Sequence, residues 1–252
     1  MKHRASFVVV FFVMFATAPA FAGSVNFNFG FGGSDTVLGT SQSYTSNGAT
    51  ITAYGYECSA PSASSTATLS NCAATDLFAK GDGPSETGLG LVGEGGGENE
   101  IGFDGTSADY VMGLDVSSLF KLGATSMTLT FGSVQPGEAF AVLGYGSDPF
   151  AAGMPFALTN TKAWCGYQTM GCTYNGDVAS ATFGLNVQDE YLVLVSPCGA
   201  SSNPTGVCGG NVLLDSLNST APTPEPASLL LFGTGLLALG FAARRRFALA
   251  RK

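Results

Sequence analysis

The segment Ser126-Met127-Thr128-Leu129-Thr130-Phe131 alternates apolar side chains with hydroxyl side chains. Successive side chains of a β-strand point to opposite faces of its sheet, so Met127, Leu129 and Phe131 would share one face. The two threonines would share the other face. This pattern predicts a strand that is buried on one side and hydrated on the other, as in an antiparallel sheet packed on a core.

Similar short segments recur every ten to fifteen residues, separated by turns rich in glycine, asparagine, aspartate and proline. The expected strands lie near residues 24–31, 49–57, 76–80, 89–92, 100–103, 110–116, 126–131, 139–145, 179–187, 190–196 and 211–217. Few apolar runs show the 3.6-residue period of a helix. We therefore expect an all-β fold, a single jelly-roll-like β-sandwich over residues 23–217.

Residues 1–22 have the composition of a secretory signal peptide. Two basic residues precede an apolar run at 7–16, and Ala20-Phe21-Ala22 supplies the small-x-small pattern that signal peptidase recognises. We expect an N-terminal signal helix that is cleaved between Ala22 and Gly23. An uncleaved anchor is the less favoured alternative because the apolar run is short.

The last thirty residues contain three features in order: Pro224-Glu225-Pro226, an apolar segment at 227–243, and Arg244-Arg245-Arg246. The two prolines hold the backbone extended and prevent a helix from starting there. The apolar segment would span about 25 Å as a helix, and the arginines would stay on the cytoplasmic side of a membrane. We therefore expect a short C-terminal transmembrane helix over 227–243.

This order of features resembles the PEP-CTERM sorting signal of Gram-negative bacteria, which here would occupy residues 224–252. The resemblance implies that an exosortase, a membrane-embedded cysteine transpeptidase, cuts near the Pro-Glu-Pro motif after signal peptidase has acted at the other end. The protein would be anchored transiently in the inner membrane and then reach the cell surface or the extracellular matrix. Residues 218–223 would tether the sandwich to the signal.

The middle of the chain also resembles the passenger domains of PEP-CTERM surface proteins. The similar segments are Leu77-Phe78-Ala79-Lys80-Gly81, Glu86-Thr87-Gly88-Leu89-Gly90-Leu91, Glu98-Asn99-Glu100-Ile101 and Asn211-Val212-Leu213-Leu214. Those passengers are generally β-sandwiches of undetermined function. The resemblance therefore implies the fold and not an activity.

Charge is distributed unevenly along the chain. Seven of the ten basic residues lie in the two terminal segments, whereas all 18 acidic residues lie between Gly23 and Pro226. Only Lys80, Lys121 and Lys162 accompany them, which gives this interval a formal charge of −15. Such a surface repels polyanions, so we expect no nucleic-acid partner.

The same interval contains no histidine and no arginine. Nucleophilic centres of the Ser-His-Asp or Cys-His type, imidazole zinc sites and arginine clamps for phosphate are therefore excluded. Carboxylates, hydroxyls and three lysines remain, and a carboxylate-based glycosidase or lyase is the enzyme class that these permit. We favour a protein that is not an enzyme and has no catalytic residues or cofactor.

Six cysteines remain in the exported interval, an even number that favours disulfides over a metal site. Of the 15 possible pairings, we favour the three local ones: Cys58–Cys72, Cys165–Cys172 and Cys198–Cys208. Each pair would close a polar loop rich in serine or glycine and stabilise the fold by about 2–4 kcal/mol.

An acidic, glycine-rich region includes Glu98, Glu100 and Asp104. Calcium prefers oxygen ligands, and flexible glycine loops can fold several carboxylates around one ion. The spacing matches no EF-hand or RTX repeat, so the favoured interpretation is a solvated acidic loop. A Ca²⁺ ion bound by these three side chains is the alternative hypothesis.

An aromatic segment surrounds the second cysteine pair and carries Trp164, Tyr167 and Tyr174. Rings held by a disulfide could stack on the CH-rich face of a sugar. The favoured interpretation is that the rings cover the core, and glycan stacking is the alternative.

Three functional classes follow. The favoured one is an exported, non-catalytic protein of the cell surface or extracellular matrix. The second is a carbohydrate-binding or calcium-stabilised adhesion module that contacts extracellular polysaccharide. The third is a carboxylate-based glycosidase or lyase, which would require paired carboxylates across a deep cleft.

Overall fold

The computed structural model describes residues 23–30, 32–59, 70–81, 86–93, 98–103, 108–136, 138–151, 160–166, 172–196, 211–220 and 234–235. The chain divides into two compact units: residues 23–222, which we call the body, and residues 1–22 with 223–252. The predicted signal helix and most of the predicted transmembrane helix lie outside the described residues. Within the described ranges, no helix has the length and apolar character needed to cross a bilayer.

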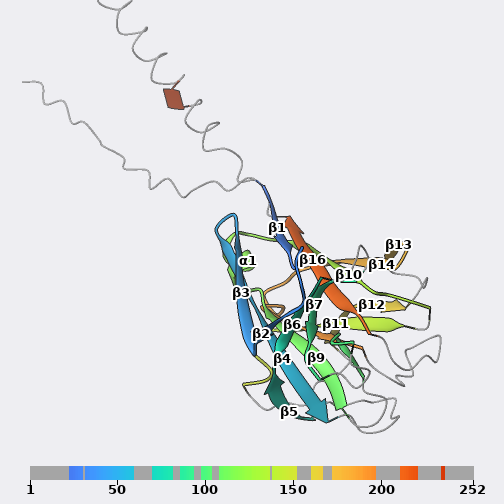
Figure 1. The fold of residues 1–252 in the computed structure, drawn as a ribbon. Coiled ribbons are helices and arrows are strands. Elements are labelled where there is room, and N and C mark those ends of the chain that lie inside the picture. The colour runs from blue at the N-terminus through green and yellow to red at the C-terminus, as the bar shows by residue number, and fades with distance from the viewer. Residues whose placement is uncertain are drawn as a thin grey trace, which may run out of the picture. The chain divides into compact units, whose positions relative to one another are not determined.

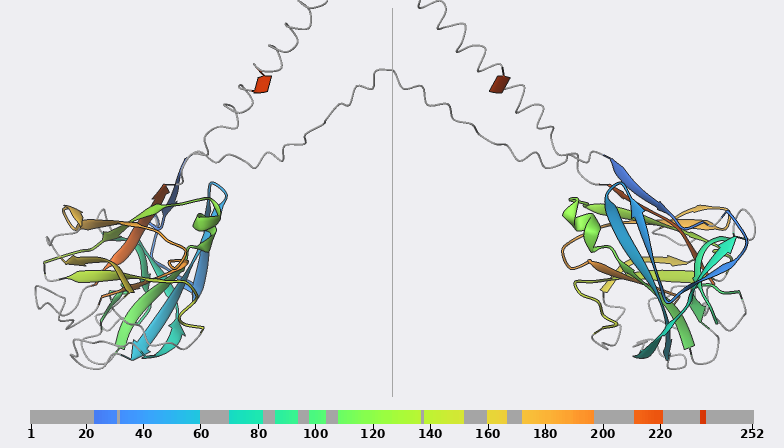
Figure 2. Two further views of the ribbon diagram at one scale, coloured as in Figure 1. Left: turned by 180° about the vertical axis from the view of Figure 1, so that it is seen from behind. Right: turned by 60° about the vertical axis from the view of Figure 1, so that its left-hand side comes forward.

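Two antiparallel sheets form the body (Figures 1 and 2). Sheet A contains β1 (Ser24–Asn28), β2 (Thr36–Gly39), β6 (Leu77–Gly81), β7 (Thr87–Leu91), β10 (Ser126–Gly132), β13 (Thr173–Asn175), β14 (Val178–Gly184) and β16 (Leu213–Thr220). Sheet B contains β3 (Ser41–Ser46), β4 (Ala49–Ser59), β5 (Ser70–Thr75), β8 (Gly102–Phe103), β9 (Ala108–Asp115), β11 (Ala139–Tyr145), β12 (Thr161–Gly166) and β15 (Tyr191–Val195). A single-turn helix, α1 (Ser117–Lys121), links β9 to β10. The predicted all-β fold is therefore confirmed.

The strand order places the last strand of the body in the middle of sheet A. That order is β13-β14-β10-β16-β7-β6-β2. One edge of β16 pairs with β10. Its other edge pairs with β7, where Leu214 lies opposite Leu89, and with β1, where Ser24 lies opposite Thr220 and Asn28 opposite Ser216. The first and last strands therefore lie side by side (Figure 1).

Sheet B has the order β12-β11-β15-β9-β4-β3, with β5 beside β4 and β8 beside β9. Its inner side chains and those of sheet A form one shared hydrophobic core. Phe131 of β10 and Phe140 of β11 stack across the core with ring centroids 3.9 Å apart. Met127, Leu129 and Phe131 are all buried, which confirms the alternation predicted for β10.

A second hydrophobic cluster covers the outer face of sheet B. Val111, Leu143 and Val193 are buried there, and Tyr56 and Trp164 pack against them. Three inner strands of this sheet, β9, β11 and β15, are thus buried on both faces. This explains why their sequences are continuous apolar runs without the alternation seen in β10.

Several strands are absent from the sequence-based expectation: β2, β3, β5, β12 and β13. β3, β5 and β13 are rich in serine, threonine or asparagine, and β2 has only four residues, none of them buried, so these four strands have no buried apolar stripe to mark them. β14 ends at Gly184, before the turn near Val187, and β16 continues to Thr220, past the expected domain end at residue 217. The extension of β16 follows from pairing with β1 and from burial of Ser219.

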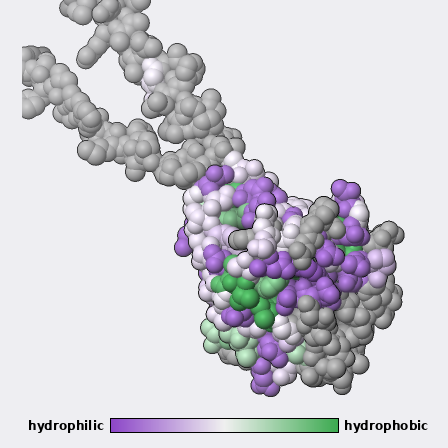
Figure 3. Space-filling view, viewed as in Figure 1, coloured by the Kyte–Doolittle hydropathy of each residue, from purple (hydrophilic) through white to green (hydrophobic). Residues whose placement is uncertain are grey.

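Figure 3 shows one face of the body, where hydrophilic residues surround a small apolar patch. Among the described large apolar side chains, Val37 on β2 and Val187 before β15 are exposed, by 53% and 78%. The remaining described apolar side chains of that size are buried or partly covered.

Candidate functional site

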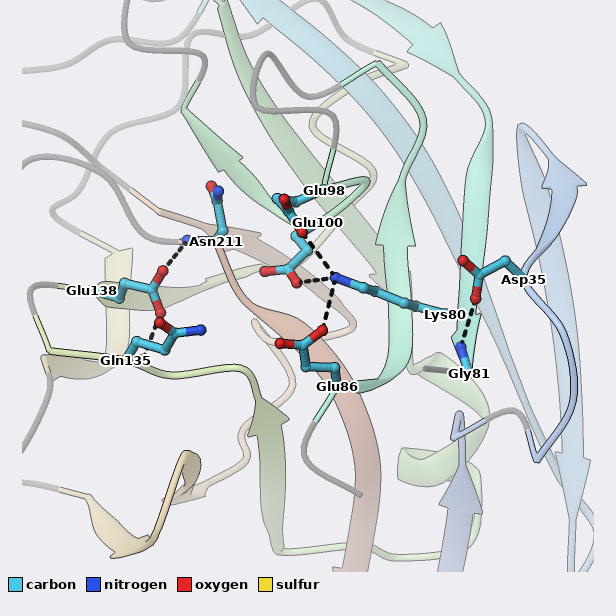
Figure 4. Close-up of polar contacts among 9 residues, drawn as sticks. All are labelled: Asp35, Lys80, Gly81, Glu86, Glu98, Glu100, Gln135, Glu138 and Asn211. Atoms are coloured by element: carbon cyan, nitrogen blue, oxygen red, sulfur yellow. Dashed lines mark hydrogen bonds and ion pairs between the residues drawn. The ribbon is translucent and has the colours of Figure 1, made fainter. Parts of the chain in front are cut away.

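Lys80 lies at the centre of a group of carboxylates beside sheet A (Figure 4). Its Nζ lies 2.8 Å from Oε1 of Glu100, 3.4 Å from Oε2 of Glu98 and 3.5 Å from Oε2 of Glu86. The side chains of Lys80 and Glu100 are 7% and 2% exposed, whereas those of Glu86 and Glu98 are 42% and 58% exposed. These four residues, which we call the lysine cluster, combine a buried ion pair with two carboxylates that face solvent.

Three segments bring the lysine cluster together. Lys80 lies on β6, and Glu86 directly precedes β7, the next strand of the same hairpin. Glu100 directly precedes Ile101, whose backbone forms an isolated bridge with Val212 next to β16. The cluster therefore joins the β6–β7 hairpin to the segment that crosses it.

Gly90 of β7 allows this crossing. A Cβ atom at position 90 would lie 2.0 Å from the carbonyl oxygen of Asn99 and 2.9 Å from the Cα of Glu100. Such contacts are closer than van der Waals distance, so a side chain would force the segment away. The backbone N–H of Leu91 donates to that same carbonyl of Asn99 at 3.2 Å, which holds the two segments together.

Burial and ion pairing shift the pKa values within the cluster. Burial raises the pKa of Glu100 to about 7, although the hydrogen bond and charge of Lys80 act in the opposite direction. Burial alone lowers the pKa of Lys80, but Glu100, with help from Glu86 and Glu98, outweighs it and raises this pKa to about 12. Lys80 therefore stays charged at neutral pH, where Glu100 titrates.

The acidic region predicted as a solvated loop or a calcium site is in part the lysine cluster. Glu98 and Glu100 both contact the Lys80 ammonium, while Asp104 lies outside the described residues. In the part of the chain that the structure describes, no three His, Cys, Asp or Glu side chains form a metal-binding group. The calcium hypothesis stays a prediction, and the cation that these two glutamates contact is a lysine.

The aromatic segment is divided between two clusters. Cys165 and Cys172 form the predicted disulfide. Trp164 packs on the outer face of sheet B, whereas Tyr174 packs against the core between the sheets. Tyr167 lies outside the described residues. Trp164 and Tyr174 thus do not share one cluster, and glycan stacking stays a prediction.

The other predicted disulfide within the described residues, Cys58–Cys72, is also present and joins β4 to β5. Cys198 and Cys208 lie outside the described residues. Two of the three predicted pairs are therefore confirmed.

A polar hollow of about 420 Å³, which the sequence did not indicate, lies near the start of β12. Tyr145, Asn160, Lys162 and Gln188 line it, together with two glycines. Lys162 Nζ lies 2.6 Å from Oδ1 of Asp189, which is fully buried. The two partners of this ion pair are 27 positions apart in the chain, and no motif links them.

The sorting residues flank the body. Gly23 is exposed and directly precedes β1, while Ala22 lies outside the described residues. At the other end β16 finishes at Thr220, and the Pro224-Glu225-Pro226 and Arg244-Arg245-Arg246 residues lie outside the described ranges. Residues 222–246 match the PEP-CTERM protein-sorting motif.

The chain carries a PEP-CTERM sorting motif. This motif indicates an exported protein that is directed to an exosortase for processing. No curated protein and no solved structure matches the chain. The resemblance of the body to the passengers of other PEP-CTERM proteins therefore stays a prediction.

Proposed function

We propose that the protein is a non-catalytic component of the cell surface or extracellular matrix of a Gram-negative bacterium. Its signal peptide is cut after Ala22, and an exosortase processes it near Pro224–Pro226 while residues 227–243 anchor it in the inner membrane. The body, a jelly-roll-like β-sandwich, is then delivered outside the cell. The observation that carries this proposal is the sorting motif at residues 222–246, which closely follows β16.

Features of the body support a structural role. Two of its three lysines, Lys80 and Lys162, form ion pairs with buried carboxylates, and this ties these charged groups into the fold. Two disulfides brace strand ends, as is common in proteins outside the cytoplasm. The large negative charge favours solubility and low affinity for polyanions.

The test is fractionation of the native cells, followed by mass spectrometry of the mature termini. We expect an N-terminus at Gly23 and a C-terminus near residues 224–226 in the surface or matrix fraction. A Pro224→Ala/Pro226→Ala variant should stay in the inner membrane with its tail intact, whereas Pro136→Ala, a control at an exposed proline outside the matched motif, should be processed normally. An intact 252-residue chain in the soluble interior would refute the proposal.

A carbohydrate-binding module is the second candidate, and the polar hollow favours it. The amide groups of Asn160 and Gln188 and the ammonium of Lys162 can hydrogen-bond sugar hydroxyls there, and Tyr145 supplies one aromatic ring to the same lining. If the hollow binds a glycan, Asn160→Ala/Gln188→Ala should abolish binding on a glycan array, while Gln135→Ala, elsewhere on the surface, should not. Loss of binding with Trp164→Ala alone would instead assign the outer face of sheet B.

A further inference from the structure

Both terminal strands leave the body at the same end. Ser24 of β1 is the register partner of Thr220 of β16, and Ser126 of β10 pairs with the same Thr220. The side-chain amide of Asn47 donates to the carbonyl of Ser24 at 3.2 Å, and the N–H of Thr125 donates to the carbonyl of Thr220 at 3.3 Å. We call this part of the body, residues 23–26, 46–50, 117–126, 184–188 and 218–220, the tether end.

Further hydrogen bonds hold the remaining segments at this end. The N–H of Thr50 donates to Oγ of Ser118 at 3.0 Å, which connects the start of β4 to α1. The N–H of Leu185 donates to the carbonyl of Thr125 at 2.9 Å, which connects the end of β14 to the start of β10. Hydrogen bonds therefore hold the segments of the tether end together in the folded body.

Only three residues, 221–223, separate Thr220 from Pro224, and the apolar segment begins at Ala227. A fully extended chain from Thr220 to Ala227 reaches at most about 25 Å. While residues 227–243 are held in a bilayer, the tether end must therefore lie within that distance of the lipid.

The tether end also differs in charge from the rest of the body. Its five segments contain no aspartate or glutamate, and Lys121 in α1 is exposed there. Outside these segments the body has 17 acidic residues against Lys80 and Lys162. Asp115, Asp189 and Glu190 adjoin these segments, so the carboxylate-free surface is limited to the segments themselves. Anionic headgroups attract an exposed lysine and repel carboxylates, so a bilayer that contacts this end would be attracted at Lys121.

Val187 adds an apolar contact. It is 78% exposed in the turn between β14 and β15, and it belongs to the tether end. An exposed apolar side chain on a surface that also carries a basic residue can enter the boundary between headgroups and acyl chains. From these observations we propose that the tether end, through Lys121 and Val187, docks on anionic phospholipid headgroups before the tail is cut. This inference rests on the proposed membrane-anchored intermediate.

The test uses the full chain with its tail, reconstituted in vesicles of brominated phosphatidylethanolamine and phosphatidylglycerol. Trp164→Phe first removes the single native tryptophan. Val187→Trp in this background should lose about half of its fluorescence to the bromine atoms, since it contacts the interface. Val37→Trp is the matched control, because Val37 is the other exposed large apolar side chain among the described residues and lies on β2, at the far edge of sheet A. It should lose little.

A charge variant adds a second readout. Lys121→Glu should reduce the quenching at position 187 in vesicles that contain phosphatidylglycerol, because the new carboxylate is repelled by the negative lipid phosphates. Equal quenching at positions 187 and 37, or none at 187, would overturn the inference. Quenching at position 187 that appears only in vesicles containing the exosortase would also overturn it, since that result would assign this end to a protein partner.

Flotation of the vesicles separates this inference from the proposed function. A chain that fails to float with lipid contradicts the anchored intermediate itself. A chain that floats without quenching at position 187 overturns only the docking of the tether end.

Discussion

Glu100 is 2% exposed beside the Lys80 ammonium, and burial raises its pKa to about 7 from an ordinary value of 4.5. Between these two values the folded protein binds more protons than the unfolded chain. The stability linked to Glu100 is therefore fully present below pH 4.5 and is lost as the pH rises through 7. The raised pKa of Lys80 acts only at strongly alkaline pH.

Glu100→Gln removes this titration. We expect the free energy of unfolding of the natural protein to fall on the order of 2 kcal/mol between pH 5 and pH 8, and the variant to show a clearly smaller fall. Urea denaturation at both pH values measures this. Glu98→Gln, at an exposed member of the same cluster, should keep the natural pH dependence. Equal slopes for Glu100→Gln and the natural protein would show that Glu100 does not titrate in this range.

At the scale of elements, the close approach of two backbone segments explains why position 90 is a glycine, which sequence reasoning did not single out. Gly90→Ala should cost about 1–3 kcal/mol, because the new methyl group meets the carbonyl of Asn99 and must push apart β7 and the segment that carries Glu100. Thermal unfolding measures the loss. Gly184→Ala is the matched control, since the closest atom to its Cβ would lie 3.9 Å away, and it should leave the midpoint almost unchanged.

The two disulfides of the described residues should differ in their contribution to stability. Cys58–Cys72 spans 14 positions and Cys165–Cys172 spans 7, and a longer closed loop restricts the unfolded chain more. Replacing both cysteines of the first pair by alanine should cost about 3 kcal/mol, and replacing those of the second should cost less. Denaturant unfolding of the two double variants compares them. A larger loss for the shorter loop would contradict this account.

The sequence revealed elements that have an apolar stripe and missed those that do not. The alternation in residues 126–131 predicted β10 and its buried face, and local cysteine spacing predicted two disulfides. β3 was missed because Ser41, Ser43 and Thr45 face solvent and its other face carries a single large apolar residue, Tyr44, on an outer strand. The lysine cluster was missed because Lys80 meets Glu100 only through the crossing of β7, and such pairing is not encoded in local spacing.

At the scale of the whole molecule, the last strand holds the fold together. β16 lies between β10 on one side and β1 with β7 on the other, and it buries Leu213, Leu214 and Leu217. The core of sheet A is therefore incomplete until the residues just before the sorting motif have been exported.

Two truncations test this. A chain that ends after residue 222 should keep a cooperative thermal transition, because the compact unit extends to that residue. A chain that ends after residue 212 lacks β16 and should lose the transition, since both flanking strands and the core lose their partner. Circular dichroism during heating compares them. Cooperative melting of the shorter chain would show that β16 is not essential.

The central position of β16 also has a mechanical consequence. If the mature protein stays joined to the surface through Thr220, a force on the attached body is transmitted along a strand that is hydrogen-bonded on both edges. Such a load shears many backbone bonds at once, whereas a pull on an outer strand would peel them one by one. Attachment through β16 would then withstand a larger pulling force than attachment through an outer strand, which suits a surface layer exposed to flow.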